Sequence, residues 1–311
     1  DPSVTLEEDL ARRDLTINAI AKSSDGKLID PFQGIDDLKK RTLRHVSDAF
    51  IEDPLRVFRV CRFTATLDFN IYPDTLKLMV RLVNTGELST LSTERVWNEI
   101  LKGLMGKKPS LMIDSLTKCG ALEAINSSLS NGVYDEKNKT FIYTALDLAA
   151  TNTLSIETRV AIFCLLTEHD VKKVIEQHSA RITARKNVSR DLLAQLRATK
   201  SQNQTSMLFL GYLGSILNAN ELSNEQIVDL VMCLDGLRNP DRFKKILDAA
   251  STVGQALIKQ NYTDHIRILM RSLNILKSIR HDDLTKIDST AEINQRVRYA
   301  RINALDTELS R

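Results

Sequence analysis

The stretch EDPLRVFRVCRF, residues 52–63, places three arginines at regular spacing inside an otherwise apolar run. At about 100° per residue, Arg56, Arg59 and Arg62 drift slowly around a helix and form one slanting polar stripe. Asp53 begins this stripe. The rest of the helix surface is apolar, so we expect it to pack against protein and the arginines to line a cleft or an internal network.

The arginine stripe needs negative charge near it. Three neighbouring guanidinium groups repel one another, and only Glu52 and Asp53 lie close in sequence to balance them. An anion from outside the chain is a natural partner, and a nucleoside triphosphate fits that need. The alternative is that carboxylates from elsewhere in the fold pair with these arginines. The spacing alone leaves both interpretations open.

The composition is that of a globular protein. The 311 residues are 42% apolar, which can fill the cores of two or three domains or of one elongated multi-lobed body. The net charge is only +3, from 43 Lys and Arg against 40 Asp and Glu, so it neither indicates nor excludes a polyanionic partner. No window approaches the ~18 continuous apolar residues of a membrane span, and the acidic first residues do not resemble a signal peptide. We therefore expect a cytoplasmic protein with no membrane contact.

The cysteines point to the same compartment. They are far apart in the sequence and form no CxxC pair, which argues against a zinc site. We expect all of them to be buried free thiols in a reducing cytosol: Cys61, Cys119, Cys164 and Cys233.

Helical periodicity extends over nearly the whole chain, and Gly and Pro are few at 11 and 6, so we predict a mainly α protein. Ser92 and Ser223 are expected N-caps. Turn signals flank two short extended segments, 27–29 and 43–46, which we interpret as strands of one small sheet. The polar stretch 125–140 resembles a linker, and we place a domain boundary there. The predicted helices are 54–67, 72–85, 93–105, 108–119, 139–150, 156–168, several between 170 and 248, 252–279 and 292–309.

A second polar stretch, LEEDLARRDLTINAI at residues 6–20, adds to the first. The pair Arg12 and Arg13 precedes Asp14, and Asn18 follows Asp14 four residues later. This group supplies donors for phosphate or ribose hydroxyls together with an acceptor that holds the arginine. Alone it is weak, because paired arginines next to an aspartate also occur as surface ion pairs of little energetic value.

Taken together, LARRDLTINAIA, LIDPFQGIDDLKKRTLRHV and EDPLRVFRVCRF, in this order and at this spacing, resemble the tRNA nucleotidyltransferases that build the 3′-terminal CCA, in their bacterial and eukaryotic class. Bacterial poly(A) polymerases share these motifs. The resemblance continues through GELSTLSTERVWNEILKGL at 86–104, with Arg95 and Glu99, and through LTKCGAL at 116–122. Beyond Ile125 it is weaker.

The resemblance implies a domain order. Residues 1–50 would be a short α/β remnant of a nucleotidyltransferase head, 51–125 a neck with nucleotide-base-binding helices, and 126–311 a helical body and tail that bind tRNA. It implies template-independent addition of C and A to the tRNA 3′ end, from CTP and ATP, by a monomeric enzyme. A bacterial poly(A) polymerase and a non-catalytic helical tRNA-binding remnant stay open as alternatives. The C-terminal DTELSR has no basic extension, which favours CCA addition.

The resemblance also implies roles for the polar residues. In the family, the carboxylate and first arginine of the EDxxR stretch hold the incoming base, here Asp53 and Arg56. One acceptor beside one donor suits the amino group and ring nitrogen of cytosine and adenine, and leaves groups unsatisfied with uracil or guanine. The remaining assignments place Asp14 and Asn18 near the ribose, and Arg13, Arg59 and Arg62 at the triphosphate and its surroundings.

Two family features are missing from this sequence. The glycine-rich segment and the two metal-binding aspartates are not here, so the Mg²⁺ expected for the intact enzyme has no ligands and we predict that the chain as given cannot catalyse transfer. We favour an intact parent enzyme over a remnant. Acidic clusters at 7–9 and 281–283 are better explained as solvated helix faces.

The second missing feature is a metal-binding His-Asp dyad, which some bacterial members carry in the body. Leu165 and Leu166 stand at that place, and His169 with Asp170 is typical of a solvated helix end. We predict no phosphatase or phosphodiesterase activity.

Two basic groups are candidates for tRNA contact by shape and phosphates. Each is equally well explained as an ordinary amphipathic helix face. The first is Lys39, Lys40, Arg41 and Arg44, and the second is Arg296, Arg298 and Arg301 with Tyr299.

Overall fold

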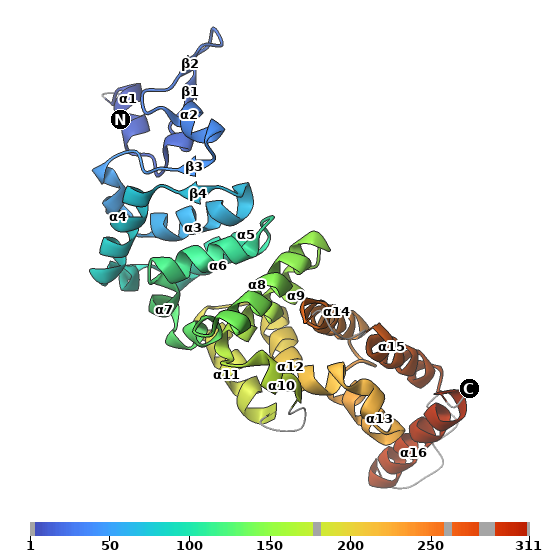
Figure 1. Ribbon diagram of the computed structural model, residues 1–311. Coiled ribbons are helices and arrows are strands. Elements are labelled where there is room, and N and C mark those ends of the chain that lie inside the picture. Colours follow the sequence, from blue (N-terminus) through green and yellow to red (C-terminus); the bar gives the residue numbers. More distant parts are fainter. Residues whose placement is uncertain (1–3, 177–181, 258–262, 280–289, 310–311) are drawn as a thin grey trace.

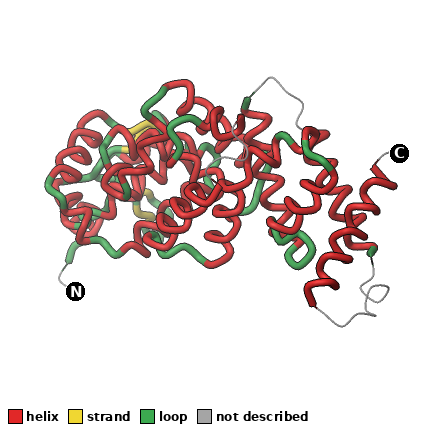
Figure 2. The backbone as a smooth tube through the Cα atoms, turned by 90° about the horizontal axis from the view of Figure 1, so that it is seen from below, coloured by secondary structure: helices red, strands yellow, loops and turns green. Residues whose placement is uncertain are grey.

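The computed structural model describes residues 4–176, 182–257, 263–279 and 290–309. It is mainly helical, as predicted, and elongated, with the N-terminal elements at one end and the C-terminal helix at the other (Figure 1). The few strands all lie in the N-terminal part, as the tube in Figure 2 also shows. Below, head, neck, and body with tail denote the predicted ranges 1–50, 51–125 and 126–311.

The head contains most of the short strands. Strands β1 and β2 pair antiparallel, whereas β3 pairs in parallel with β4 (Asn70–Ile71) of the neck. The two segments predicted as strands of one sheet therefore belong to two separate ladders, because the chain passes through a neck helix before β4 comes alongside β3. The head elements are α1 (Leu6–Ala11), η1 (Thr16–Asn18), β1 (Ala21–Lys22), β2 (Leu28–Ile29), α2 (Gly34–Lys39), β3 (Thr42–Leu43) and η2 (Asp48–Glu52).

The neck is built around α3 (Leu55–Leu67), which packs against α5 (Thr93–Leu104) and α6 (Pro109–Lys118). Pro54 precedes the first turn of α3, and Asp68 ends the helix in the left-handed region at φ 61°. Ser92 caps α5 by accepting from the backbone N–H of Arg95, as predicted. The other neck elements are α4 (Pro73–Asn84), η3 (Glu87–Thr90) and α7 (Ala121–Ile125).

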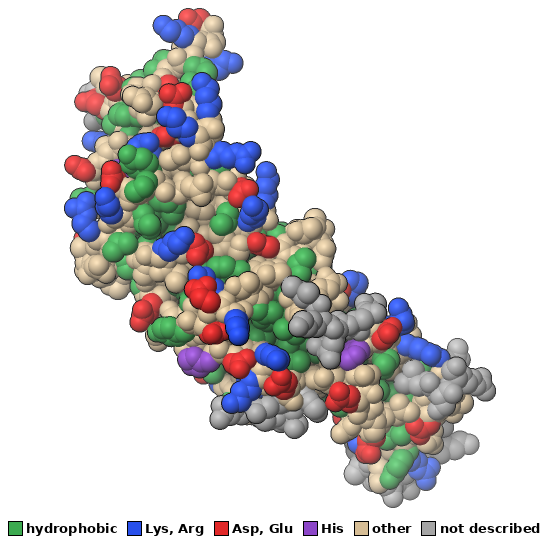
Figure 3. All heavy atoms as spheres, viewed as in Figure 1, with side chains coloured by type: hydrophobic (Ala, Val, Ile, Leu, Met, Phe, Trp, Pro, Cys, Tyr) green, Lys and Arg blue, Asp and Glu red, His purple; other side chains and the backbone are tan. Residues whose placement is uncertain are grey.

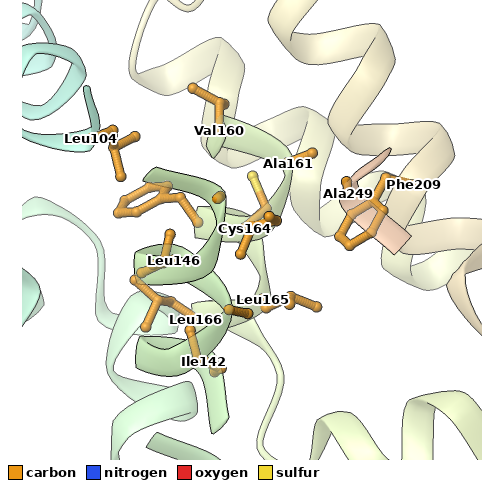
Figure 4. Packing of buried hydrophobic residues seen from close by; sticks show 14 of the residues in the cluster. Leu104, Ile142, Leu146, Val160, Ala161, Cys164, Leu165, Leu166, Phe209 and Ala249 are labelled. Atoms are coloured by element: carbon orange, nitrogen blue, oxygen red, sulfur yellow. The ribbon is translucent and has the colours of Figure 1, made fainter. Parts of the chain in front are cut away.

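The body packs its helices around a continuous apolar core. Leu146, Cys164 and Phe209 come from three different elements and are fully buried there (Figure 4). Ser223 caps its helix in a capping box with Gln226, as predicted. The body and tail elements are η4 (Ser127–Val133), α8 (Glu136–Thr151), α9 (Ile156–Phe163), η5 (Cys164–Thr167), α10 (Val171–Glu176), α11 (Ile182–Gln195), α12 (Lys200–Leu217), η6 (Ala219–Glu221), α13 (Asn224–Cys233), α14 (Pro240–Ala256), α15 (Thr263–Ser278) and α16 (Thr290–Leu309).

The stretch 125–140 is packed rather than linker-like. It forms η4 and the start of α8, and Leu129, Ser130 and Gly132 are buried. A Cβ on Gly132 would lie 2.6 Å from the Cα of Leu166, so the backbone needs glycine to approach the body this closely. The domain boundary at this place stays a prediction.

The prediction of one helix over 252–279 is wrong. Helix α14 already begins at Pro240 and continues through Thr252 to Ala256, and α15 begins at Thr263. The helix continues past Asp248, where Lys244 pairs with Asp248 at 2.7 Å one turn apart. The Thr252 hydroxyl donates to the Asp248 carbonyl at 2.8 Å.

The cysteine prediction needs one correction. Cys61, Cys119 and Cys164 are buried free thiols, but Cys233 is a free thiol exposed to solvent. The buried side of α13 is formed by Ile227, Val228, Leu230 and Val231, and Cys233 at the last position falls outside it. Within the described ranges, no helix is long and apolar enough for a bilayer crossing.

Candidate nucleotide-binding cleft

The N-terminal half of α3 forms one wall of a cleft between head and neck. The cleft has a volume of about 520 Å³. Its lining contains five arginines and two aspartates, so it carries an excess of positive charge. It unites six of the seven predicted site residues, with Arg62 the exception; the full lining is Arg12, Arg13, Asp14, Asn18, Asp53, Leu55, Arg56, Arg59, Phe63 and Arg95.

Arg59 is anchored by the head. Its Nε donates to Asp14 Oδ2 at 2.7 Å, and Asp14 Oδ1 accepts from the side chain of Asn18 and from the backbone N–H of Leu15, each at 2.9 Å. Burial by itself raises the pKa of Asp14, but the hydrogen bond from Asn18 and the charge and hydrogen bond of Arg59 outweigh it, so the pKa lies below its ordinary value. Asp14 is therefore a buried carboxylate that fixes Arg59 across the head–neck junction.

Arg56 joins the same two parts through backbone carbonyls. Its Nη1 donates to the carbonyl of Ala49 and its Nη2 to that of Arg12, both at 2.6 Å. A guanidinium has more donors than these two bonds use, so Arg56 keeps capacity for a ligand.

Asp53 is held from two directions. Its Oδ1 accepts from the backbone N–H of Leu55 at 3.1 Å, which satisfies a donor at the start of α3. Its Oδ2 accepts from Arg95 on α5 at 2.9 Å. Each carboxylate oxygen can accept a further hydrogen bond, and the Asp53 side chain is 36% exposed, so a ligand can reach it.

Arg62 is the site residue that the structure places elsewhere. Its Nε donates to Glu99 Oε2 at 2.5 Å, and Glu99 also pairs with Lys102 at 3.0 Å. Burial tends to raise the pKa of Glu99, but these two cations hold it below the ordinary value. Arg62 thus follows the alternative interpretation, in which a carboxylate from another element neutralises the arginine.

The lining contains residues that the sequence reasoning did not assign to the site. Arg12 belongs to the arginine pair that precedes Asp14, although it received no separate role. Arg95 belongs to the motif at 86–104, but nothing in its spacing indicated that it reaches the same cleft as Asp53. Phe63 lies under the arginines, with its ring centroid 3.9 Å from Arg62 Cζ and 6.0 Å from Arg59 Cζ. Only its place at the end of the quoted stretch could have pointed to it. Arg13, the outermost predicted residue, pairs with Asp9 at 2.7 Å on the surface.

The place of the missing His-Asp dyad is apolar. Leu165 and Leu166 are fully buried in the body core (Figure 4). His169 is exposed, and Asp170 accepts from the backbone N–H of Lys173 at 3.0 Å as a helix end. The prediction that phosphohydrolase activity is missing remains a prediction.

The candidate RNA contacts differ in how far their charges are already compensated. Arg44 is bound to Asp37 at 3.0 Å, and Arg298 is bound to Glu225 at 2.6 Å. Arg301 instead lines a separate hollow of about 440 Å³ with Arg238 and Lys277. Lys39, Lys40, Arg41 and Arg296 are exposed. On the face in Figure 3, basic and acidic side chains are interspersed along the molecule.

Metal ligands do not come together in the described part of the chain. No group of three or more His, Cys, Asp or Glu side chains is placed there to hold an ion. Asp14, the buried carboxylate of the cleft, is occupied by Arg59, Asn18 and a backbone N–H, which does not suit Mg²⁺. The 281–283 cluster lies outside the described residues.

Comparison with known proteins identifies the family. Two family models match the chain: the Poly A polymerase head domain over residues 2–44, and the probable RNA and SrmB- binding site of polymerase A over residues 68–131. The Multifunctional CCA protein of Dechloromonas aromatica (strain RCB) is 38% identical over 322 residues, which cover 97% of this chain and 77% of the relative. The chain belongs to the family of CCA-adding enzymes.

Solved structures of CCA-adding enzymes share the fold. The Bacillus stearothermophilus CCA-adding enzyme in complex with CTP gives a TM-score of 0.68 at 23% identity, covering 97% of this chain and 70% of that one. The Thermotoga maritima CCA-adding enzyme complexed with tRNA gives 0.66 at 17% identity, covering 98% and 70%. At such identities the likeness concerns the fold, and it confirms the predicted class of a head followed by helical domains.

Proposed function

We propose that this protein adds C and A nucleotides to the 3′ end of tRNA without a template, with CTP and ATP as substrates and release of pyrophosphate. The observation that carries the proposal is the basic cleft in which Asp53 and Arg56 lie next to Arg59, Arg12 and Arg13. Membership of the CCA-adding family and the neighbouring structures that contain CTP and tRNA support the choice of substrates.

Base selection is assigned to Asp53 and Arg56. Asp53 accepts from the amino group of cytosine or adenine, while Arg56 donates to the adjacent ring nitrogen. Both side chains are fixed by backbone partners before a base arrives, which reduces the entropy lost on binding. Uracil and guanine present the opposite pattern and would leave the donor and the acceptor unpaired, which is strongly unfavourable in a partly buried site.

The triphosphate is assigned to the arginines that line the cleft. Arg59 and Arg13 neutralise the phosphates as pyrophosphate leaves, and Arg12 at the same cleft joins them. Asp14 and Asn18 stand next to the ribose. Arg62 receives no phosphate contact in this proposal, because Glu99 already binds it outside the cleft.

The tRNA is assigned to the body and tail, with the hollow at Arg301 as the preferred contact. Arg301 shares this hollow with Lys277 and Arg238, and Asp235 there is already paired with Arg238 and Arg242. A phosphate would therefore meet cations in excess. Arg298 is less suited because two carboxylates, Glu225 and Asp229, already bind it.

Mg²⁺ is part of this proposal for the intact enzyme, where it would stabilise the attacking and leaving oxygens. The described residues do not fit the ion, so no step is assigned to it here. We also propose that the protein is cytoplasmic, since its four free thiols suit a reducing compartment. We further propose that it is a monomer, and light scattering measures its oligomeric state.

The test is nucleotide binding by calorimetry with CTP, ATP, UTP and GTP. We expect CTP and ATP to bind and UTP and GTP to bind much more weakly. Arg59→Ala is expected to raise the dissociation constants for CTP and ATP by about tenfold to a hundredfold, because it removes a charge-assisted contact worth roughly 1.5–3 kcal/mol.

The matched control is Arg81→Ala, an exposed arginine on the neighbouring helix α4 that does not line the cleft. It should bind nucleotides as the parent does. Unchanged affinity in Arg59→Ala would contradict the assignment of the cleft. Binding of ATP without CTP would favour a poly(A) polymerase, and tRNA binding without any nucleotide binding would favour a non-catalytic remnant.

A further inference from the structure

The turn between α5 and α6 is held from the body by two side chains of opposite charge. Arg159, on α9, donates from Nη1 to the carbonyls of Leu104 at 2.8 Å and Gly106 at 3.4 Å. Asp147, on α8, accepts from the backbone N–H and the hydroxyl of Ser110, at 3.1 and 2.7 Å. A cation thus meets the carbonyl end of α5 and an anion meets the N–H end of α6, the combination that helix dipoles favour.

Arg159 is an unusual group to bury. It is 4% exposed, burial lowers its pKa, and the described residues offer it no ion pair. Its remaining bond, from Nε to the carbonyl of Leu154 at 2.9 Å, stays within the body. The charge is therefore compensated by carbonyls at the end of α5, and these bonds form only when α5 ends at this place.

The turn that Arg159 holds is pressed directly against α3. The backbone N–H of Lys108 donates to the carbonyl of Ala65 at 3.0 Å. A Cβ on Gly106 would lie 2.8 Å from that same oxygen, so the turn lies in tight contact with α3. The C-terminal end of α5 is consequently fixed between α9 and α3.

Further along, α5 carries the partners of two predicted site residues. Arg95 binds Asp53 at 2.9 Å and Glu99 binds Arg62 at 2.5 Å. A helix of 12 residues is a nearly rigid rod of about 18 Å, so a shift at one end moves the other by a similar amount. A displacement of about 1 Å is enough to weaken hydrogen bonds of this length.

We propose that Arg159 is a positioning residue of the nucleotide site. By fixing the C-terminal end of α5, it sets the axial position from which Arg95 and Glu99 hold Asp53 and Arg62. This inference rests on the proposed function, since it concerns the affinity of the same cleft for CTP and ATP. It assigns to the body, through α9, a part in nucleotide binding, although none of the described body residues lines the cleft.

The experiment compares Arg159→Met with Arg242→Met in the full chain. Arg242 is the matched control, because it is a largely buried arginine of α14 whose partners, Asp235 and Gln204, lie far along the chain from the neck. Dissociation constants for CTP and ATP are measured well below the melting temperature of each variant. Arg159→Met is expected to raise both constants by about tenfold, whereas Arg242→Met should stay within about twofold even if its melting temperature falls as much.

Equal affinity in Arg159→Met and the parent would overturn the inference, and so would equal weakening by Arg242→Met. If Arg159→Met does not fold, Arg159→Lys keeps the charge but cannot span all three carbonyls, and a several-fold loss is expected. In a double-mutant cycle, Arg159→Lys should add little to Arg95→Gln, and additive losses would contradict an action through α5. Absence of nucleotide binding in the parent would instead refute the proposed function.

Discussion

At the scale of single residues, Asp14 is the clearest link between sequence and site. The sequence placed it beside Arg13, but in the structure its partner is Arg59, which lies 45 residues away in sequence, on a neck helix. Three donors surround the carboxylate, so the folded protein favours its ionised form. Asp14 therefore couples the protonation of the site to the stability of the head–neck junction.

This coupling predicts a specific acid dependence. Because the pKa of Asp14 in the folded protein lies below its ordinary value of 3.8, its contribution to stability is present above that value and is lost as the pH falls through the folded pKa. We expect the free energy of unfolding of Asp14→Asn to be about 1–2 kcal/mol lower than that of the parent at pH 7. The difference between the two proteins should shrink in acid. Urea unfolding from pH 7 to about pH 2 measures this, because the loss falls below the ordinary pKa.

The control is Asp36→Asn, which removes an exposed carboxylate that only approaches Lys39 at 3.7 Å. Its effect on the free energy of unfolding should be small at neutral pH. A constant difference between parent and Asp14→Asn over the whole pH range would refute the coupling.

At the scale of elements, the packing of α2 against η1 positions the head side of the cleft. Gly34 begins α2, and a Cβ there would lie 2.1 Å from the carbonyl oxygen of Thr16 and 2.9 Å from the Ile20 side chain. Thr16 also donates to Asp37 on α2 at 2.7 Å. Helix α2 thus fixes η1, which follows Asp14 closely in the sequence and ends at Asn18, another residue of the cleft.

Gly34→Ala should accordingly disturb both stability and the cleft. The added methyl group meets backbone, which cannot swing aside, so we expect a loss of about 2–3 kcal/mol in unfolding free energy and weaker CTP binding. Gly86→Asn is the control: Gly86 has nothing within 4 Å and a φ of +79°, which asparagine tolerates. Thermal melts and calorimetry compare them, and a neutral Gly34→Ala would show that the head can relax around the methyl group.

At the scale of the whole molecule, the cleft is lined by head and neck residues, whereas the hollow at Arg301 is lined by residues in or next to α13, α15 and α16. These two groups of elements lie in different parts of the elongated chain (Figure 1). A tRNA bound to both would have its 3′ end at the head–neck cleft and its phosphates on the tail. The mixed surface charge in Figure 3 fits a substrate held at a few defined places rather than by one continuous basic face.

The salt dependence of tRNA binding tests this arrangement. Each phosphate contact contributes roughly 0.7–0.9 to the slope of log affinity against log salt. Arg301→Gln should therefore weaken tRNA binding and reduce the slope by about that amount. Arg298→Gln, on the same helix, should change it far less, because Glu225 and Asp229 already neutralise Arg298. Equal effects of the two variants, measured by filter binding from 50 to 300 mM salt, would exclude the hollow as the contact.

The sequence by itself determined the mainly helical class, most helix positions, both serine caps and the family. These follow from local causes: helical periodicity, capping chemistry and motif spacing act over a few residues. It also named six of the residues that line the cleft.

Only the tertiary structure decided which of these groups meet. Arg62 pairs with Glu99, Arg95 reaches Asp53 and Arg159 reaches Leu104 across 37, 42 and 55 residues of sequence. Such partners are brought together by the packing of α3, α5 and α9. Because a charged side chain takes whichever compensating group the packed core leaves within reach, its partner cannot be read from its own sequence neighbourhood.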